Sequence, residues 1–342
     1  GNVSGMYWAN IFSVPGDDDD ALYLLGVSDG DHASIRHIVI SKSTDVGSTW
    51  TKPSILFTSN KTADVYHCAP TPTLVGDDGR MYRAFESSRP GDTTDYSRAF
   101  VVATVDPVAS LKSVDLLSTS AWRKLPVVTF DPALMVPSDW DRKGSYFWQE
   151  GNAVEWNGTL YDVLRIDGQT NVTYNKAALI RYNNDKSAVG FDRMIDFPST
   201  TSKFVIRKDP TSGMSGAPEI FLSIVNDVTE RNRETGNVYA RNHLSLAISA
   251  ADSLYEWSVC ATLLTDDTGI AKDADVSAAY TGFHYVDWIF DGDDILYAVR
   301  TGYRGSNSYH NANRMTVKRI KDFRKLFDRA TGRCTDGSER EL

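Results

Sequence analysis

The 342-residue sequence has no apolar run near the roughly 20 residues that a helix needs to cross a bilayer. Its longest apolar stretches, such as residues 21–27, have the length of single strands. Positive charge is also in deficit, because 36 Lys and Arg stand against 45 Asp and Glu, a formal net charge of -9. An acidic surface repels phosphate backbones. The sequence therefore excludes membrane spanning and argues against nucleic acid as a partner.

Cysteine is scarce as well, and three cysteines allow at most one internal disulfide. We expect Cys260 to pair with Cys334, because this bond would fasten the C-terminal tail to the body of the protein. Cys68 is then expected to be a buried thiol, the common state of an unpaired cysteine.

The sequence also lacks an initiator Met and a signal-like apolar segment at its start, as a chain does after removal of a secretory peptide. It carries four N-glycosylation sequons, at Asn2, Asn60, Asn157 and Asn171. The Asn-Gly pair at 157–158 is typical of a hairpin turn, which would expose that sequon. We therefore expect a secreted, extracellular protein.

Helical periodicity is nearly absent, and short β-rich runs alternate with turn signals instead. Residues 69–75 and 80–87 flank Gly-Asp-Asp-Gly, and residues 153–156 and 159–166 flank Asn-Gly. Each hairpin is followed by a polar segment and two further β-rich runs. This repeat, at intervals of about 60 residues, predicts four-stranded sheets arranged radially.

We therefore predict an all-β protein that forms a single β-propeller domain over residues 1–342. Five modules are clear, and they begin near Tyr7, His67, Phe147, Lys203 and Phe283. Residues 105–146 and 265–282 are long enough to hold further strands. In such a blade, the start of the first strand and the loop between the second and third strands lie at the same mouth of the central funnel. Residues at those places are candidates for a functional site.

Four of the six histidines fall at this predicted mouth. His67 and His284 open first strands, while His243 and His310 open third strands. No H-x-H, H-E-x-x-H or C-x-x-C spacing favours zinc. We expect a functional role for at least one of these histidines, because imidazole exchanges protons near neutral pH.

Arginines form a second group of candidates. Arg165 and Arg300 end predicted second strands, whereas Arg241 and Arg314 lie near the starts of third strands. A guanidinium group matches a carboxylate with two parallel hydrogen bonds. In a protein of net charge -9, cations gathered at one mouth would concentrate an anionic substrate.

Aromatic and acidic side chains complete the candidate site. Tyr303 follows Arg300 in a loop, and we expect its ring to be exposed for stacking on a sugar. Glu150 is one of the acidic candidates. A hydrolase would need two carboxyl groups about 5–10 Å apart, and no motif fixes such a pair.

Several stretches resemble a known family. Residues 43–50 (STDVGSTW) match the Asp-box hairpin of sialidase-like propellers, in which we expect Asp45 to accept backbone N–H bonds and Gly47 to supply a positive φ. More specific stretches are 66–71 (YHCAPT), 149–152 (QEGN), 204–210 (FVIRKDP), 282–288 (GFHYVDW) and 293–301 (DDILYAVRT). From His67 onward, these resemble the sialidase-like polysaccharide lyases that include ulvan lyases and L-rhamnose-α-1,4-D-glucuronate lyases.

The resemblance implies a seven-bladed propeller, two blades more than the pattern indicates. It also implies a proton-transfer histidine in the funnel, for which the matching position is His67. No organic cofactor is implied, but a calcium ion at the propeller centre is, without named ligands. One Asp box and no Arg-Ile-Pro tripeptide near the start argue against sialic acid cleavage.

The implied chemistry is β-elimination from a uronate. A base removes H5, the bond from C4 to its oxygen breaks, and a C4–C5 double bond forms. We predict that His67 acts as base and acid. The predicted carboxylate clamps are Arg165, Arg241 and Arg300. Further substrate-binding candidates are His284, Tyr303, Arg314 and Glu150.

The expected partner is an acidic polysaccharide or oligosaccharide with a rhamnose-capped glucuronate, as in a plant gum, and we expect the protein to be a monomer. Two alternatives stay open at this point. A glycoside hydrolase on the same propeller, rhamnosidase-like or sialidase-like, would add water and form no double bond. A non-catalytic sugar-binding propeller would release no product.

Overall fold

The structure is a computed structural model. It describes residues 5–14, 17, 21–28, 35–59, 64–88, 96–108, 115–138, 140, 146–168, 175–227, 229–230, 234 and 237–335. Strands make up most of the regular structure, and the longest described helix, α3 (Ala274–Tyr280), has seven residues. None of the described helices is long and apolar enough to span a membrane. The shorter helical segments are η2 (Thr119–Ala121), α1 (Pro132–Met135), η3 (Met214–Gly216), η4 (Gly269–Lys272) and η5 (Phe323–Leu326).

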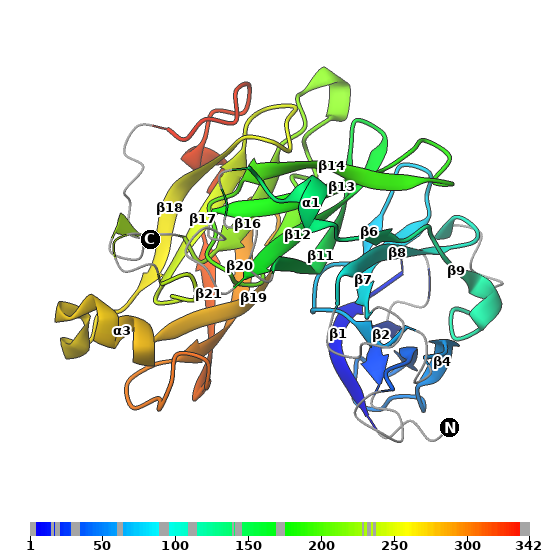
Figure 1. Ribbon diagram of the computed structural model, residues 1–342, viewed down its shortest axis with the longest axis horizontal. Coiled ribbons are helices and arrows are strands. Elements are labelled where there is room, and N and C mark those ends of the chain that lie inside the picture. The colour runs from blue at the N-terminus through cyan, green and yellow to red at the C-terminus, as the bar shows by residue number, and fades with distance from the viewer. Residues whose placement is uncertain are drawn as a thin grey trace. The chain divides into compact units, whose positions relative to one another are not determined.

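Five sheets follow one another along the chain (Figure 1). The first contains β1 (Met6–Phe12), β2 (Leu22–Ser28), β3 (Ile38–Ser43) and β4 (Ser54–Phe57). The second contains β5 (Tyr66–His67), β6 (Leu74–Val75), β7 (Met81–Ser87), β8 (Arg98–Thr104), β9 (Trp122–Lys124) and β10 (Val128–Thr129). The third contains β11 (Tyr146–Trp156), β12 (Thr159–Gly168), β13 (Lys176–Tyr182) and β14 (Val189–Asp196).

The last two sheets complete the series. The fourth contains β15 (Val205–Lys208), β16 (Phe221–Val225), β17 (His243–Ser249) and β18 (Trp257–Thr265). The fifth has three described strands, β19 (Gly282–Asp291), β20 (Asp294–Gly302) and β21 (Arg314–Ile320). Sheets built from strands that are consecutive in sequence are the blades of a β-propeller. The all-β fold is therefore that of a five-bladed β-propeller.

The five modules expected from the sequence pattern are confirmed, whereas the seven blades implied by the resemblance are not found in the described residues. Between 105 and 146, β9 and β10 have only three and two residues, and both pair with β8 of the second sheet. Between 265 and 282 the chain forms η4 and α3. The carboxylate of Asp273 caps α3 by accepting the N–H groups of Asp275 and Val276, which favours helix over strand there.

The chain divides into two compact units. The first unit comprises residues 1–135, 147–164 and 179–193, and the second comprises 136–146, 165–178 and 194–342. Strands of the third sheet contribute residues to both units. A core that includes Leu25, Phe85 and Phe100 lies in the first unit, and one that includes Leu246 and Trp288 lies in the second. A single domain over 1–342 stays a prediction.

The Asp box forms the turn that the motif predicts, between β3 and β4. Asp45 accepts hydrogen bonds from the backbone N–H and hydroxyl of Thr49 and from the hydroxyl of Ser43. Gly47 has a φ of 86°, and its carbonyl accepts a hydrogen bond from the indole of Trp50. These contacts are all internal to the turn, so the motif has an architectural role.

The disulfide prediction is confirmed, since Cys260 of β18 is bonded to Cys334 near the C-terminal end. Cys68 is a free, buried thiol, and burial raises its pKa to about 12. Asn157 lies in the exposed turn between β11 and β12, as expected. The other three sequons lie outside the described residues.

Candidate active site

His67 at the end of β5 is paired with a buried carboxylate. It lies opposite Glu86 of β7, and its Nδ1 is 2.8 Å from Oε2 of that side chain. The other oxygen, Oε1, accepts the backbone N–H of Gly151 at 2.8 Å. A carboxylate only accepts hydrogen bonds, so opposite an ionised Glu86 the Nδ1 of His67 donates, and in the neutral ring the lone pair is then on Nε2. No described residue hydrogen bonds to Nε2, and 11% of the histidine side chain is exposed.

Among the described residues, two aromatic rings and the guanidinium group of Arg36 lie around His67. The ring of Tyr96 stacks on the imidazole with centroids 4.7 Å apart, and the indole of Trp8 lies 4.8 Å from it. Arg36 donates a hydrogen bond to the hydroxyl of Tyr96, and its guanidinium carbon is 5.0 Å from the centre of the Trp8 ring. We call His67, Trp8, Arg36 and Tyr96 the His67 cluster. It combines an imidazole, a cation and exposed aromatic surface within the first unit.

Three carboxyl groups of the first unit lie beneath the surface. Glu86 and Asp162 have no exposed area, and Glu150 is 4% exposed. A Cβ atom added to Gly151 would be 2.2 Å from Oδ1 of Asp162, so only glycine fits between β11 and this carboxyl group. Burial, followed by the charge of Glu86, raises the pKa of Asp162 well above its usual value. Glu150 presents little surface in this structure, and its role as a substrate-binding residue stays a prediction.

In the second unit, the predicted arginines gather around Tyr285. The guanidinium carbons of Arg241 and Arg300 lie 5.7 and 5.6 Å from the centre of its ring. Arg165 and Arg241 both donate to the carbonyl of Thr201, at 2.7 and 3.5 Å. The structure therefore brings together the three arginines that the sequence predicted as carboxylate clamps.

Exposure and pairing separate these three arginines. Arg165 is 6% exposed and forms an ion pair with Asp167, whose other oxygen accepts the hydroxyl of Tyr239. Arg241 is 5% exposed, whereas Arg300 is half-buried and donates to the carbonyl of His310. Arg300 is thus the member of the set with the most accessible surface.

His284 has no exposed surface and packs on His310, with ring centroids 5.6 Å apart. Burial, followed by the positive charges of Arg241 and Arg300, lowers the pKa of His284 from 6.5 to about 3. Its ring is therefore neutral at neutral pH. The ring does not reach the surface, and the role of His284 as a substrate contact stays a prediction.

Two further predicted positions differ from expectation. Tyr303 is 9% exposed, because the guanidinium group of Arg314 lies 4.5 Å over its ring and Phe283 packs beside it. Arg314 itself is exposed at the start of β21. His310 lies in the turn that precedes β21, not at the start of a strand. The covering arginine removes Tyr303 from the set of exposed stacking rings.

Three residues in the first strands of their sheets have a positive φ. The values are 51° at Trp8 of β1, 60° at Glu150 of β11 and 52° at Tyr285 of β19. At Trp8 and Tyr285 the pairing register also shifts, which marks a β-bulge. Such a backbone is strained for a bulky residue, and strain of this kind collects at functional sites. Each bulge directs an aromatic ring into one of the two clusters.

Sequence reasoning missed Trp8, Arg36, Glu86 and Tyr96. One signal was available for Glu86, because a charged residue inside an otherwise buried strand usually has a specific partner. All seven residues of β7 are buried, and the strand includes Arg83 as well as this glutamate. No local pattern marks the other three, since they approach His67 from distant parts of the sequence.

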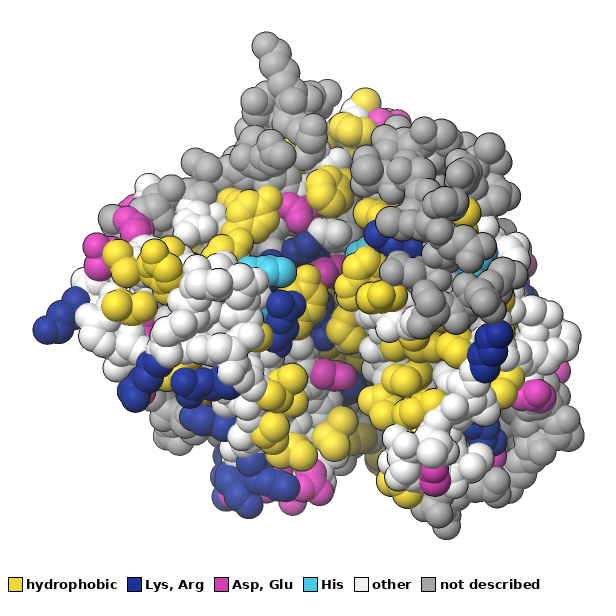
Figure 2. Space-filling model, turned by 90° about the horizontal axis from the view of Figure 1, so that it is seen from below, with side chains coloured by type: hydrophobic (Ala, Val, Ile, Leu, Met, Phe, Trp, Pro, Cys, Tyr) yellow, Lys and Arg dark blue, Asp and Glu magenta, His cyan; other side chains and the backbone are white. Residues whose placement is uncertain are grey.

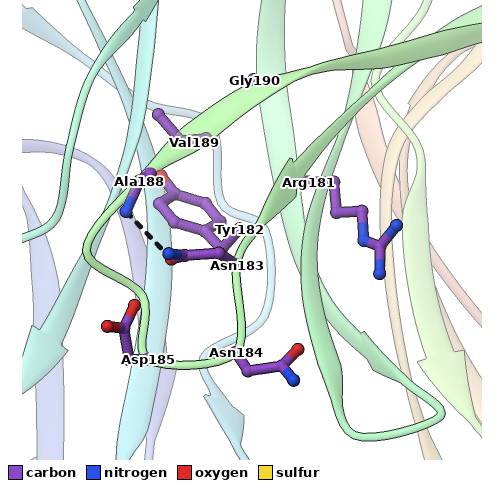
Figure 3. Close-up of a pocket in the computed structure, with 8 residues that line it drawn as sticks. All are labelled: Arg181, Tyr182, Asn183, Asn184, Asp185, Ala188, Val189 and Gly190. Carbon is purple, nitrogen blue, oxygen red and sulfur yellow. Dashed lines mark hydrogen bonds between the residues drawn. The ribbon is translucent and has the colours of Figure 1, made fainter.

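The structure also contains a pocket at the β13–β14 hairpin (Figure 3). It is lined by Arg181, Tyr182, Asn183, Asn184, Asp185, Ala188, Val189 and Gly190. Asn183 and Asp185 already bond within the turn, to Ala188 and Ser187. The lining has no histidine and no pair of carboxyl groups, so this pocket is not a candidate for the chemistry.

The described residues contain no group of three or more His, Cys, Asp or Glu side chains arranged to hold a metal ion. The implied calcium ion therefore finds no fitting ligand set among them, and we assign it no step.

Figure 2 shows a face of the molecule on which histidine side chains lie beside basic and hydrophobic side chains.

No protein-family model matches the chain, and no curated protein matches it. Among solved structures, an α-L-arabinofuranosidase from Lactobacillus brevis has a TM-score of 0.51 at 10% identity, over 98% of this chain and 95% of that one. An exo-β-1,3-galactanase from Clostridium thermocellum has a TM-score of 0.49 at 12% identity, over 87% and 55%. A sialidase variant from Streptococcus pneumoniae has 0.49 at 14%, over 84% and 36%.

These neighbours are sialidase-like and GH43-type β-propeller glycosidases at low sequence identity. The chain spans about half the length of the galactanase chain and about a third of the sialidase chain. At such identities the likeness to the arabinofuranosidase shows a shared fold. The chemistry must be argued from the side chains of this chain.

Proposed function

We propose that this protein is an extracellular polysaccharide lyase that cleaves a rhamnosyl-α-1,4-glucuronate linkage by β-elimination. The observation that carries the proposal is the His67–Glu86 pair, in which Nδ1 is bonded to a buried carboxylate and Nε2 has no described partner. This arrangement fixes the tautomer and orientation of the ring, as in other histidine bases held by a carboxylate. The Cys260–Cys334 disulfide fits an oxidising, extracellular setting.

In the proposed reaction, Nε2 of His67 removes H5 of the glucuronate. The electrons of the C5–H bond form the C4–C5 double bond, and the C4–O bond breaks with its electrons moving to the departing oxygen. The imidazolium group then returns the proton to that oxygen, which releases L-rhamnose or a rhamnosyl chain. One histidine serves both steps if hydrogen and leaving group depart from the same face of the ring.

The uronate carboxylate must be neutralised before H5 becomes acidic enough to remove. Arg36 is the cation that the structure places in the His67 cluster, through its contacts with Trp8 and Tyr96. It is half-buried, so it retains surface for a ligand. Arg165, Arg241 and Arg300 lie in the second unit, and their role as carboxylate clamps stays a prediction, with Arg300 the most accessible of the three.

Burial of the acidic groups argues for elimination over two-carboxylate hydrolysis. A glycosidase of the usual kind needs two carboxyl groups that both touch the sugar. Glu86 and Asp162 have no exposed area, and Glu86 is already bonded to both His67 and Gly151. Among the described residues of this cluster, the imidazole reaches the surface and is paired as a base requires, which favours a histidine-based reaction.

The test is to incubate the protein with a rhamnose-capped glucuronan while recording ultraviolet absorbance, with rhamnose measured by chromatography. An unsaturated uronate absorbs, so rhamnose release with rising absorbance supports the lyase. Rhamnose release without absorbance would instead identify a hydrolase, and binding without release a sugar-binding protein. His67→Ala should lower turnover about 10²–10⁴-fold, the usual contribution of a general base.

A matched control is His243→Ala. His243 of β17 has the same kind of pairing, with Nδ1 2.6 Å from Oδ1 of Asp227, but it is not part of the His67 cluster. We expect this variant to keep turnover within about threefold, well below the effect of losing a general base. Equal losses in the two variants would remove His67 from its special role.

A further inference from the structure

Trp8 is unusual among the tryptophans of this protein because its side chain is exposed. Its exposed fraction is 38%, whereas Trp122, Trp140, Trp148 and Trp288 are all buried at 6% or less. A large aromatic ring left at the surface gives up the free energy that burial would bring. The exposure therefore calls for an explanation in terms of what the ring contacts.

The backbone at Trp8 is held in a strained conformation from both sides. Its φ of 51° lies in a region that bulky residues rarely adopt, at the bulge between Tyr7 and Asn10. On the neighbouring strand, any side chain at Gly26 would come within 2.7 Å of the Tyr7 carbonyl and 2.8 Å of Cα of Ala9. Both strands are thus built to accommodate the bulge.

Two buried side chains hold the carbonyl of Trp8 in place. It accepts hydrogen bonds from Sγ of Cys68 at 3.3 Å and from Nη2 of Arg83 at 3.4 Å. Arg83 has no exposed surface and also donates to the carbonyls of Leu25 and Ala69. A strained residue that is fixed this firmly presents its side chain in one direction, which is the property of a pre-organised binding surface.

We propose that Trp8 is the aromatic platform on which the pyranose ring of the acidic sugar stacks while it is bound at His67. The indole centroid lies 4.8 Å from the imidazole, and Arg36 lies over the same indole. A uronate has an apolar C–H face and a carboxylate, and these match an indole beside a guanidinium group. The inference rests on the proposed function for the location of the substrate, but not on the type of bond cleavage.

Trp8→Gly is the most informative variant. Glycine adopts a positive φ without strain, so this change removes the indole and leaves the backbone conformation unstrained. Trp8→Phe keeps an aromatic ring of smaller area. Tyr7→Ala is the matched control, because Tyr7 is 46% exposed on the same strand and its ring centroid is 6.3 Å from that of Trp8.

Binding is measured by calorimetry with a rhamnosyl-glucuronate disaccharide, in a His67→Ala background that prevents turnover. We expect Trp8→Gly to weaken binding about tenfold and Trp8→Phe by less than about threefold, in line with the free energy of aromatic contacts. Tyr7→Ala should leave the affinity unchanged. Quenching of tryptophan fluorescence by the disaccharide should be present in the parent and absent from Trp8→Phe.

Unchanged affinity in Trp8→Gly, or an equal loss in Tyr7→Ala, overturns the proposal. If Trp8→Gly does not fold, the fluorescence comparison with Trp8→Phe decides, and unchanged quenching overturns it. A purely structural Trp8 would lower the melting temperature without moving the dissociation constant. If the active protein releases rhamnose without an ultraviolet-absorbing product, the proposed β-elimination is wrong. The binding results still test whether Trp8 contacts the sugar.

Discussion

His67 and His284 have the same side chain but lie in opposite electrostatic surroundings. In the first unit, His67 is partly exposed, and its Nδ1 is bonded to the carboxylate of Glu86. In the second unit, His284 is fully buried, and its charged neighbours Arg241 and Arg300 are cationic. A negative partner favours protonation of an imidazole, whereas burial and positive neighbours oppose it. Of the two rings, only His67 is partly exposed and bonded to a carboxylate, which is the arrangement that the proposed base requires.

Position at a predicted funnel mouth does not by itself identify a base. Both histidines were placed there by the same reasoning from strand order. What separates them is the charge of the residues that pack against each ring, and the strands that carry those residues lie far apart in sequence.

The largest effect is expected for Glu86→Gln. The amide can donate a hydrogen bond to Nδ1, which moves the ring hydrogen to Nε2 and removes the lone pair needed for proton abstraction. Turnover should fall about 10²–10⁴-fold, with little change in KM. The measurement is the initial rate of absorbance increase on a rhamnose-capped glucuronan.

Glu155→Gln is the control for that variant. Glu155 of β11 is a buried glutamate in the same unit that accepts the backbone N–H of Asp77 at 2.5 Å, away from the imidazole. Its turnover should match the parent. A loss as large as that of Glu86→Gln would show that any buried charge in this unit supports activity, and the distinction between the two histidines would lose its basis.

The second effect concerns stability and follows from the low pKa of His284. The ring has a pKa of about 3 in the folded protein and 6.5 in the reference state, so the unfolded chain binds more protons between these values. Stability is therefore full above pH 6.5 and falls as the pH drops toward 3. The slope contributed by this group is about 1.4 kcal/mol per pH unit.

Urea unfolding of the parent and of His284→Gln at pH 7, 6, 5 and 4 tests this slope. Other groups titrate in both proteins, so the difference between the two curves isolates His284. The variant should lose less stability than the parent for each unit of acidification. Parallel curves would mean that His284 titrates normally and that its cationic surroundings have no effect on it.

A smaller effect is expected for Arg300→Gln. If this guanidinium group binds the uronate carboxylate, KM should rise about tenfold, the loss expected for one charge-assisted hydrogen bond. The methyl ester of the same substrate has no carboxylate charge, and its KM should not change. Arg319→Gln, an exposed arginine paired with Asp291 and Asp294, should change neither value. Equal losses on acid and ester would assign Arg300 to holding the turn at His310.

Much of the fold could be predicted from local signals. The hairpins depend on Gly, Asn and Asp in turns, and these residues fix the chain over a few positions, so the pattern identified five blades. Counting left three possible pairings of the cysteines, and Cys260–Cys334, chosen because it fastens the C-terminal tail, is the one that forms. The two additional blades were implied only by the resemblance. Of the two segments long enough for further strands, 105–146 adds the short strands β9 and β10 to the second sheet, and Asp273 caps a helix within 265–282.

The candidate site could be predicted only in part. Arg165, Arg241 and Arg300 do gather in one cluster, as their positions at strand ends suggested. Exposure could not be predicted, because it depends on which long side chain covers which ring. Arg314 covers Tyr303 in this way. The partners of His67 were not predictable either, since Trp8, Glu86 and Tyr96 reach it through tertiary packing.

The smallest effect is expected for Asp45→Asn in the Asp box, which lies in the same unit as His67. Hydrogen bonds from Thr49 and Ser43 lower the pKa of Asp45 to about 2. Its contribution to stability is therefore present above the unfolded value of 3.8 and is lost as the pH falls toward 2. At pH 7 the variant should melt slightly earlier than the parent, and this difference should shrink at pH 2.5.

Turnover of the same variant on the acidic glycan should be unchanged, because the hydrogen bonds of Asp45 are internal to the turn. A loss of turnover comparable to that of Glu86→Gln would show that the His67 cluster responds to any disturbance of its unit, and the assignment of a special role to the carboxylate would fail.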